Sequence, residues 1–332
     1  MLEVVDLRPF SPDDAGAVRS HVEVTNAVRC ADSPWLPPLT EHEAVGMLTY
    51  GWDLEPRVAF LALDGDDVVG VASFSISERD NLHLAWLGVE VHPTYRRCGH
   101  GAAMLDQLIE RVRSLGRTSI GIDGWESEQV RAFAARHGLD QKAVGVNRRQ
   151  LLADLDWAEL DRSYAAAAAH ASPYELVRRQ GPTPADELEA MAVMVAAIND
   201  APTDDLDIED EVFDADRVRA YETAHEQRGI ALHRVVARHK ETGELAGHTV
   251  VGVDLERPEL GEQHDTSVLG SHRGHRLGLL LKLEMLRWLR DEQPQLESID
   301  TWNAESNDHM IGVNAAMGYQ IMGRALEYQR SV

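Results

Sequence analysis

The sequence is poor in the features that anchor secreted and membrane proteins. Its 332 residues include only two cysteines, Cys30 and Cys98, too few for a disulfide framework or a quartet of metal ligands. No apolar run is long enough to span a bilayer, and Met1–Leu7 lacks the basic segment and apolar core of a secretion signal. These absences predict a cytoplasmic protein that holds no metal and does not enter a membrane.

Positive charge is also scarce. The chain has 32 Lys and Arg residues against 56 Asp and Glu residues, which gives a formal net charge of −24. A nucleic-acid backbone would be repelled over much of such a surface, so we expect no nucleic-acid partner. The same field would attract small cationic molecules such as amines. Alternatively, the excess of acidic residues only keeps the protein soluble.

A basic, glycine-containing segment stands out against this background. The apolar run Leu82–Val91 predicts a strand, and it is followed by His92–Gly101 and then by a helix with apolar residues at helical spacing. Gly99 and Gly101 allow the backbone to turn its N–H groups toward the point at which the helix begins. A helix N-terminus carries a partial positive charge, so this segment is suited to binding phosphate.

The same arrangement occurs a second time, in Thr266–Gly278. Three pairs of residues mark the repeat: Arg96 with Arg273, Gly101 with Gly278, and Gly138 with Gly318. The first two pairs are 177 positions apart and the third is 180 apart. A nearly constant offset over such a length indicates duplication of a whole domain.

The duplication predicts where the domains lie. We expect an N-terminal domain over 1–155 and a C-terminal domain over 173–332, both of ordinary size. Between them, 156–172 contains the alanine run Ala165–Ala169, which favours a connecting helix.

Each half shows the order strand, two helices, hairpin, strand, Arg-x-x-Gly-x-Gly loop (altered in the second half), helix, strand and helix. This order resembles the GNAT (GCN5-related N-acetyltransferase) family over nearly the whole chain. The resemblance implies an α/β fold of two tandem GNAT domains. Each would have a mixed, mostly antiparallel sheet with a splayed cleft between its fourth and fifth strands, flanked by helices. It also implies an acyltransferase (EC 2.3.1.-) that uses acetyl-CoA as co-substrate and transfers its acetyl group directly to a primary amine.

The resemblance further implies which residues contact acetyl-CoA. In that family the glycine-containing loop holds the pyrophosphate, and the end of the fourth strand meets the pantetheine. The corresponding residues of the first copy are Val89, Val91, Arg96, Arg97, Gly99, His100 and Gly101. Those of the second copy are Val268, Arg273, Gly274, His275, Arg276, Gly278 and Asn307. The second copy departs from the family pattern because Arg276 stands at the position of Gly99. Arg276 reduces the backbone freedom of the loop and adds a cation, which would either bind a phosphate or fold across an empty site.

The family's usual proton donor, a tyrosine in the helix after the fifth strand, is missing. Its position, four residues before the glycine that ends the helix, falls on Ala134 in the first copy and Asn314 in the second. Neither can act as a phenolic acid. Asn314 could still donate a hydrogen bond to the sulfur of the leaving thiolate.

Candidate bases are concentrated in the second copy. Glu262, His264 and Asp265 begin its fourth strand, whereas the first copy has a mainly apolar strand there, with Glu90 near its end. Because side chains alternate along a strand, we expect His264 and Asp265 on opposite faces. Asp265 is our first choice for the base and Glu262 the second, and this asymmetry favours the C-terminal domain as the catalytic one.

Several alternatives stay open at this point. The acidic stretch Asp204–Glu211 is either a solvated loop or a wall that attracts a cationic substrate. The chain is either an acetyltransferase or an acyl-CoA-binding regulatory or structural protein without turnover. Within the enzyme class, the two-copy architecture resembles the mycothiol synthases, in which the C-terminal copy is active. A monomer formed as an internal pseudo-dimer and a homodimer are both consistent with a duplicated chain.

Overall fold

The computed structural model of the chain describes residues 5–332, which fold as two compact units. The N-terminal unit comprises the residues up to Gly145 together with Thr203–Asp210 and Gly323–Val332. The C-terminal unit comprises Val146–Pro202 and Glu211–Met322. These bounds differ from the predicted ranges 1–155 and 173–332, because two segments of the second half belong to the N-terminal unit. Across residues 5–332, no helix combines the length and the apolarity that crossing a bilayer requires.

The N-terminal unit is built on a sheet with the strand order β1-β2-β3-β4-β5-β12. Its strands are β1 (Asp6–Pro9), β2 (Val58–Asp64), β3 (Asp67–Ser75), β4 (Leu84–Val91), β5 (Ser119–Trp125) and, from Gly323 onward, β12 (Gln320–Ser331). Its helices are α1 (Ala15–Asp32), α2 (Glu41–Tyr50), α3 (His100–Ser114) and α4 (Glu128–Arg136). All neighbouring strands are antiparallel except β4 and β5, which are parallel.

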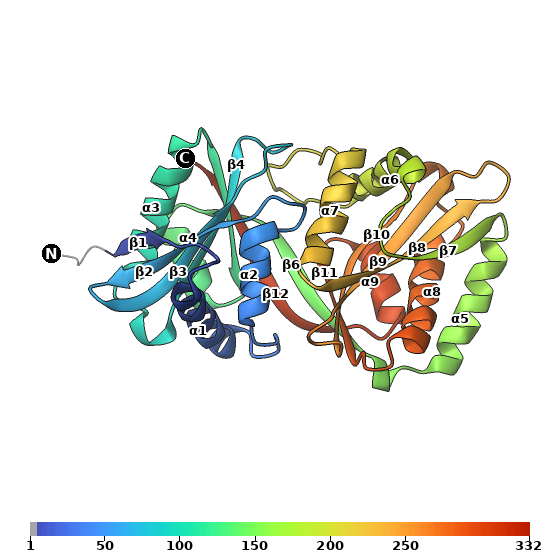
Figure 1. Ribbon diagram of the computed structural model, residues 1–332, viewed down its shortest axis with the longest axis horizontal. Coiled ribbons are helices and arrows are strands. Elements are labelled where there is room, and N and C mark those ends of the chain that lie inside the picture. Colours follow the sequence, from blue (N-terminus) through green and yellow to red (C-terminus); the bar gives the residue numbers. More distant parts are fainter. Residues whose placement is uncertain (1–4) are drawn as a thin grey trace. The chain divides into compact units, whose positions relative to one another are not determined.

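The helices of this unit cover both faces of its sheet (Figure 1). Adjacent residues of β3 show this: Ala72 lies in the core that includes Leu105 of α3, whereas Val71 packs with Ala17 of α1. Successive side chains of a strand point to opposite faces, so α3 and α1 pack on opposite sides.

The C-terminal unit repeats this plan with the strand order β6-β11-β10-β9-β8-β7. Its strands are β6 (Asp140–Leu151), β7 (Tyr174–Gln180), β8 (Ile230–His239), β9 (Leu245–Asp254), β10 (Leu260–Val268) and β11 (Ser298–Ala304). Its helices are α5 (Trp157–His170), α6 (Leu188–Val195), α7 (Ala215–Gln227), α8 (Leu277–Glu292) and α9 (Asp308–Ala316). Val235 of β8 packs in the core with α8, and the next residue, Val236, packs with α6.

The predicted connecting segment 156–172 is helical but is not a linker. It forms α5, whose Leu160 and Ala167 are buried in the core of the C-terminal unit. Of the alanine run, Ala167 is buried in this core and Ala168 packs against it, whereas Ala165, Ala166 and Ala169 are exposed.

Each unit is completed by a strand from the other half of the sequence. Residues of β12 pair with β5 in the N-terminal unit, and β6 adjoins β11 in the C-terminal unit. Equivalent hydrogen bonds hold the two exchanged strands. Arg330 Nη1 of β12 donates to His137 O, just after α4. Gln150 Nε2 of β6 donates to Met317 O, just after α9, at 2.5 Å. The duplication is therefore structural as well as sequential, with the last strands exchanged.

The predicted splayed cleft is present in both units. The parallel pairing of β4 with β5 runs from Leu84 to Leu87 and then stops, and that of β10 with β11 runs only from Leu260 to Glu262. Beyond these points the strands diverge, which leaves one side of β4 and of β10 without a strand partner.

Candidate active sites

The loops that follow β4 and β10 have the same backbone conformation but place glycine differently. Two residues of each loop are left-handed: Arg97 (φ 67°) and Gly99 (φ 94°) in the first, and Gly274 (φ 87°) and Arg276 (φ 57°) in the second. The order of glycine and arginine is thus reversed between the copies. Although Arg276 has less backbone freedom than glycine, it adopts the left-handed conformation of Gly99 at a modest steric cost.

Both loops present a row of backbone donors. Within the part of the chain that the structure describes, the N–H groups of 97–101 and of 274–278 donate to no backbone or side-chain acceptor. These groups lead directly into the first turns of α3 and α8, whose N-terminal N–H groups also lack intrahelical partners. Such an arrangement fits the phosphates of a nucleotide cofactor.

The arginine that begins each loop is already engaged. Arg96 Nε donates to Val91 O at 3.1 Å, and Arg273 Nε donates to Val268 O at the same distance. The guanidinium of Arg96 binds the carboxylate of Asp32, and that of Arg273 binds Asp200. Both were expected to contact the cofactor. The structure gives them contacts that position the loops.

Of the other predicted cofactor residues, two valines lie beside the cleft, and three polar residues contact other parts of the chain. Val89 and Val91 lie in the part of β4 that pairs with β3 but has no partner on the β5 side, as a pantetheine contact requires. His100 is buried with its Nε2 3.7 Å from Asp64, and His275 lies against the ring of Tyr174. Asn307 caps α9 by accepting from Met310 N at 3.2 Å.

The side chain predicted to donate a hydrogen bond to the leaving thiolate is enclosed. Asn314 is completely buried, and its Nδ2 donates to Asn303 Oδ1 at 2.6 Å. One of the two N–H donors of its amide group is therefore used by a neighbouring side chain.

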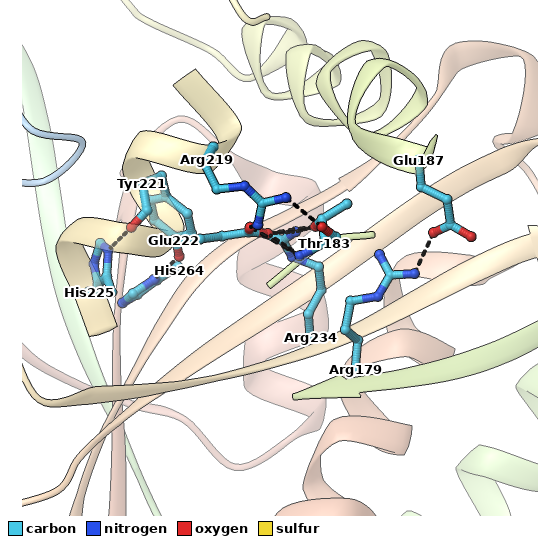
Figure 2. Close-up of polar contacts among 9 residues, drawn as sticks. All are labelled: Arg179, Thr183, Glu187, Arg219, Tyr221, Glu222, His225, Arg234 and His264. Carbon is cyan, nitrogen blue, oxygen red and sulfur yellow. Dashed lines mark hydrogen bonds and ion pairs between the residues drawn. The ribbon is translucent and has the colours of Figure 1, made fainter. Parts of the chain in front are cut away.

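The predicted opposite orientation of His264 and Asp265 is wrong. Gln263 pairs with Val251 and Thr266 with Thr249, so His264 and Asp265 both oppose Val250 in a β-bulge. His264 Nδ1 hydrogen-bonds the hydroxyl of Tyr221 on α7 at 2.5 Å, as Figure 2 shows. Asp265 interacts electrostatically with the same tyrosine. The extra residue of the bulge thus breaks the strict alternation of side chains, and His264 contacts α7.

Burial shifts the pKa values of both titratable side chains in this bulge. Burial raises the pKa of Asp265, and the cation of Arg234 opposes that rise. Burial lowers the pKa of His264 well below its usual value, which keeps this ring neutral. Glu262 is exposed, 4.0 Å from His264 Nε2. Of the two predicted bases, Asp265 has the more strongly altered surroundings.

A neighbouring set of charges is structural. The buried carboxylate of Glu222 accepts from Thr183 N and Oγ1, from Arg219 and from Arg234 (Figure 2). All its lone pairs are thereby occupied, so it ties α7 to β8 and to the segment after β7.

The N-terminal unit contains several polar residues on its β4/β5 edge, of which the sequence analysis had named only Glu90. Trp86 Nε1 donates to Asp123 Oδ1 at 2.8 Å, and Glu327 of β12 lies directly opposite Asp123. Glu90 accepts from Thr25 Oγ1 at 2.6 Å, and burial raises its pKa. The alternation of Trp86, Gly88 and Glu90 along β4 was a signal for one face, but nothing local pointed to Glu327.

The acidic stretch Asp204–Glu211 also lies in an unexpected place. Thr203–Asp210 belongs to the N-terminal unit, where Asp207 N donates to Gln329 and Glu209 N donates to Asn81. It is therefore an ordered loop across the strands of that unit.

Comparison with known proteins agrees with this architecture. Residues 26–139 match the model of the acetyltransferase (GNAT) family. A mycothiol acetyltransferase of Stackebrandtia nassauensis is 30% identical over 147 residues, which cover 43% of this chain and 46% of that protein. The chain thus matches about half the length of that relative.

Two solved structures match over the full chain. A tandem GNAT protein from the clavulanic acid biosynthesis pathway is 25% identical with a TM-score of 0.81, and the match covers 98% of each chain. A GCN5-related N-acetyltransferase from Sphaerobacter thermophilus shares the fold, with 15% identity, a TM-score of 0.65 and coverage of 99% and 96%. Residues 26–139 thus match the GNAT acetyltransferase family, and the whole chain, with its two splayed clefts, has the architecture of a tandem GNAT protein.

Proposed function

We propose that this protein transfers the acetyl group of acetyl-CoA directly to the primary amine of a small, cationic acceptor. The observation that carries the proposal is the row of unpaired N–H groups at the start of α3 and α8, each beside a splayed cleft. The net charge of −24 supports a cationic acceptor.

Catalysis is assigned to the C-terminal unit, with Asp265 as the base. Its carboxylate accepts a proton from the acceptor's ammonium group, which frees the nitrogen lone pair to attack the thioester carbonyl. A C–N bond forms, the C–S bond breaks, the nitrogen loses its second proton to solvent, and the leaving thiolate takes a proton from solvent. The raised pKa of Asp265 suits this role, because a more basic carboxylate accepts the ammonium proton more readily.

The test follows thiol release from acetyl-CoA across a panel of small primary amines. Asp265→Asn should lower kcat by about 100-fold or more for the best acceptor. Glu297→Gln, which removes an exposed carboxylate of the same unit, should leave the rate unchanged. Equal rates for Asp265→Asn and the unmutated protein would exclude Asp265 as the base.

A second candidate is an acyl-CoA-binding protein without turnover. It is favoured by the residues at the family's tyrosine position, Ala134 and the enclosed Asn314. Such a protein would be stabilised against heat by coenzyme A yet release no thiol with any amine. Turnover with one amine would exclude it.

The acceptor and the setting are also proposals. The name of the Stackebrandtia relative favours testing a mycothiol-type acceptor first among the amines. We propose that the protein acts in the cytoplasm on a small molecule, as a monomer or a homodimer, without nucleic acid.

A further inference from the structure

The strand β10 contains one residue more than the facing part of β9 can pair with. His264 and Asp265 both lie opposite Val250, between two regular pairs. In the N-terminal unit the stretch of β4 from Trp86 to Val91 pairs with β3 without any shift in register. Of these two strands only β10 has the bulge, so the proposed base stands on a local irregularity of the C-terminal unit.

The buried side chain of Gln263 spans this bulge. Its Nε2 donates to Val250 O on the facing strand at 2.6 Å and lies 3.2 Å from His264 O within the bulge. The same nitrogen is 3.0 Å from Thr249 Oγ1, which hydrogen-bonds Thr266 Oγ1 at 2.7 Å. An amide group has two N–H donors, and here three oxygens surround them. One side chain thus ties β9 to the backbone of the bulge.

Gln263 lies on the apolar face of the sheet, which carries α8. It pairs with Val251, a residue of the core that includes α8. At the same place in the N-terminal unit Leu87 pairs with Phe74, and both belong to the core. A buried amide costs free energy unless its hydrogen bonds are made. The bonds across the bulge therefore explain why a glutamine is kept at a position that suits leucine.

The next pair on this face changes in the same way. It is Ala72 with Val89 in the N-terminal unit and Thr249 with Thr266 in the C-terminal unit. The first pair makes apolar contacts, whereas the hydroxyls of the second bond to each other and to Gln263. These polar side chains accompany the bulge and are not a general feature of the fold.

On the opposite face, α7 holds the other side of the bulge. His264 Nδ1 hydrogen-bonds the hydroxyl of Tyr221 at 2.5 Å. Tyr221 and Arg234 of β8 also interact electrostatically with Asp265. The residue before Asp265 is fixed by α7 and the residue after it by the threonine pair, so the position of the bulge sets the direction of this carboxylate.

We propose that Gln263 is a positioning residue, whose amide fixes the place of the extra residue in β10 and thereby the direction in which Asp265 points. The pairing on either side keeps the extra residue in the strand, but without the amide it can shift along β10. A shift by one position moves the side chains between the old and the new place to the other face. The inference rests on the function proposed above, because it concerns the base assigned there.

The first test examines the surroundings of Asp265 without turnover. Burial raises the pKa of this carboxyl group, so stability is lost as the pH rises through the folded-state pKa. Asp265→Asn has no such group and should gain stability relative to the unmutated protein between about pH 4 and pH 8. In a Gln263→Leu background the pH at which this gain develops should move by about 1 unit or more, because Asp265 then has different neighbours. Urea unfolding at several pH values measures it.

The second test compares turnover in two variants with the same substitution. Gln263→Leu should lower kcat about 10- to 100-fold for the best acceptor, while the KM for acetyl-CoA changes less than about 3-fold. Gln150→Leu also removes a buried glutamine of the C-terminal unit, one that donates to Met317 O, and should keep its kcat. Thr249→Val is the milder variant for both tests if Gln263→Leu does not fold. It removes one partner of the amide and should lower kcat about 3-fold or more.

Two results would overturn the proposal. One is a gain of stability that develops at the same pH whether or not the bulge is altered, and the other is an equal loss of kcat in Gln263→Leu and Gln150→Leu. The unfolding measurement decides the role of Gln263 even if no amine is acetylated. Conversely, an unchanged kcat in Asp265→Asn would reject this residue as the base and leave the contact that positions it intact.

Discussion

The guanidinium of Arg96 forms two hydrogen bonds with the carboxylate of Asp32, 2.8 and 2.6 Å long. Asp32 is the last residue of α1, so this pair joins that helix to the start of the loop that follows β4. Arg273 and Asp200 repeat the contact in the C-terminal unit at 2.5 Å. The arginine at the start of each loop is therefore held in place by an acidic side chain.

Replacing that partner distinguishes positioning from direct charge attraction. Asp32→Asn removes a negative charge near the loop, which by charge alone would strengthen binding of an anionic cofactor. We expect about 3- to 10-fold weaker coenzyme A binding at the N-terminal unit, because Arg96 is no longer held in a two-bond geometry. Calorimetry resolves the two sites, and Asp200→Asn is the matched variant for the other unit. Tighter binding in Asp32→Asn would contradict the positioning role.

Arg276 is expected to act on stability and on binding in opposite directions. Its left-handed backbone costs an arginine roughly 1 kcal/mol that glycine does not incur, so Arg276→Gly should stabilise the folded protein by up to about that amount. Loss of the guanidinium should weaken coenzyme A binding at the C-terminal unit. Urea unfolding and calorimetry measure the two effects. Unchanged binding would mean that Arg276 does not contact a phosphate.

Lys282 should make stability depend on pH. Its side chain is 1% exposed, with its Nζ 5.0 Å from the centroid of the Tyr319 ring, and burial lowers its pKa from 10.5 to about 7. Between these two values the unfolded chain holds a proton that the folded protein has released. Stability therefore rises with pH across this window, and the cost of burying the charge is fully present below pH 7.

The variant Lys282→Leu removes that cost. Leu105 occupies the equivalent position of α3 and is completely buried, so leucine suits the site. At pH 6 we expect the variant to be more stable by roughly 3–5 kcal/mol, with the difference shrinking as pH rises toward 10. Urea unfolding at several pH values measures it. A difference that does not change with pH would show that Lys282 keeps its charge when folded.

Glu222 should be essential for the stability of the C-terminal unit. Glu222→Gln leaves the buried guanidinium of Arg234 without its carboxylate, and we expect a loss of roughly 3–5 kcal/mol. Glu187→Gln is the control, since Glu187 pairs with Arg179 and Arg238 in a more exposed setting. It should cost about 1 kcal/mol or less. A similar loss in both variants would argue against a special role for burial.

Local pattern was enough to find the duplicated loops and the family. Gly99, Gly274 and the arginines that precede them mark tight turns at helix starts, and such turns depend on a few neighbouring residues. The splayed cleft followed from the family resemblance. By contrast, the faces of His264 and Asp265 were misassigned, because a bulge adds a residue that strict alternation does not anticipate.

The sequence by itself determined that this chain has two copies of one domain, each with a basic turn between a strand and a helix. Only the tertiary structure decided which strand completes which unit. Pairing of β12 with β5 joins residues some 200 positions apart, and nothing in the local pattern of either strand selects that partner. The same holds for Glu327 beside Asp123 and for Asp32 beside Arg96. These contacts between residues far apart in the sequence depend on how whole helices and strands pack, and they determine the charge at each cleft.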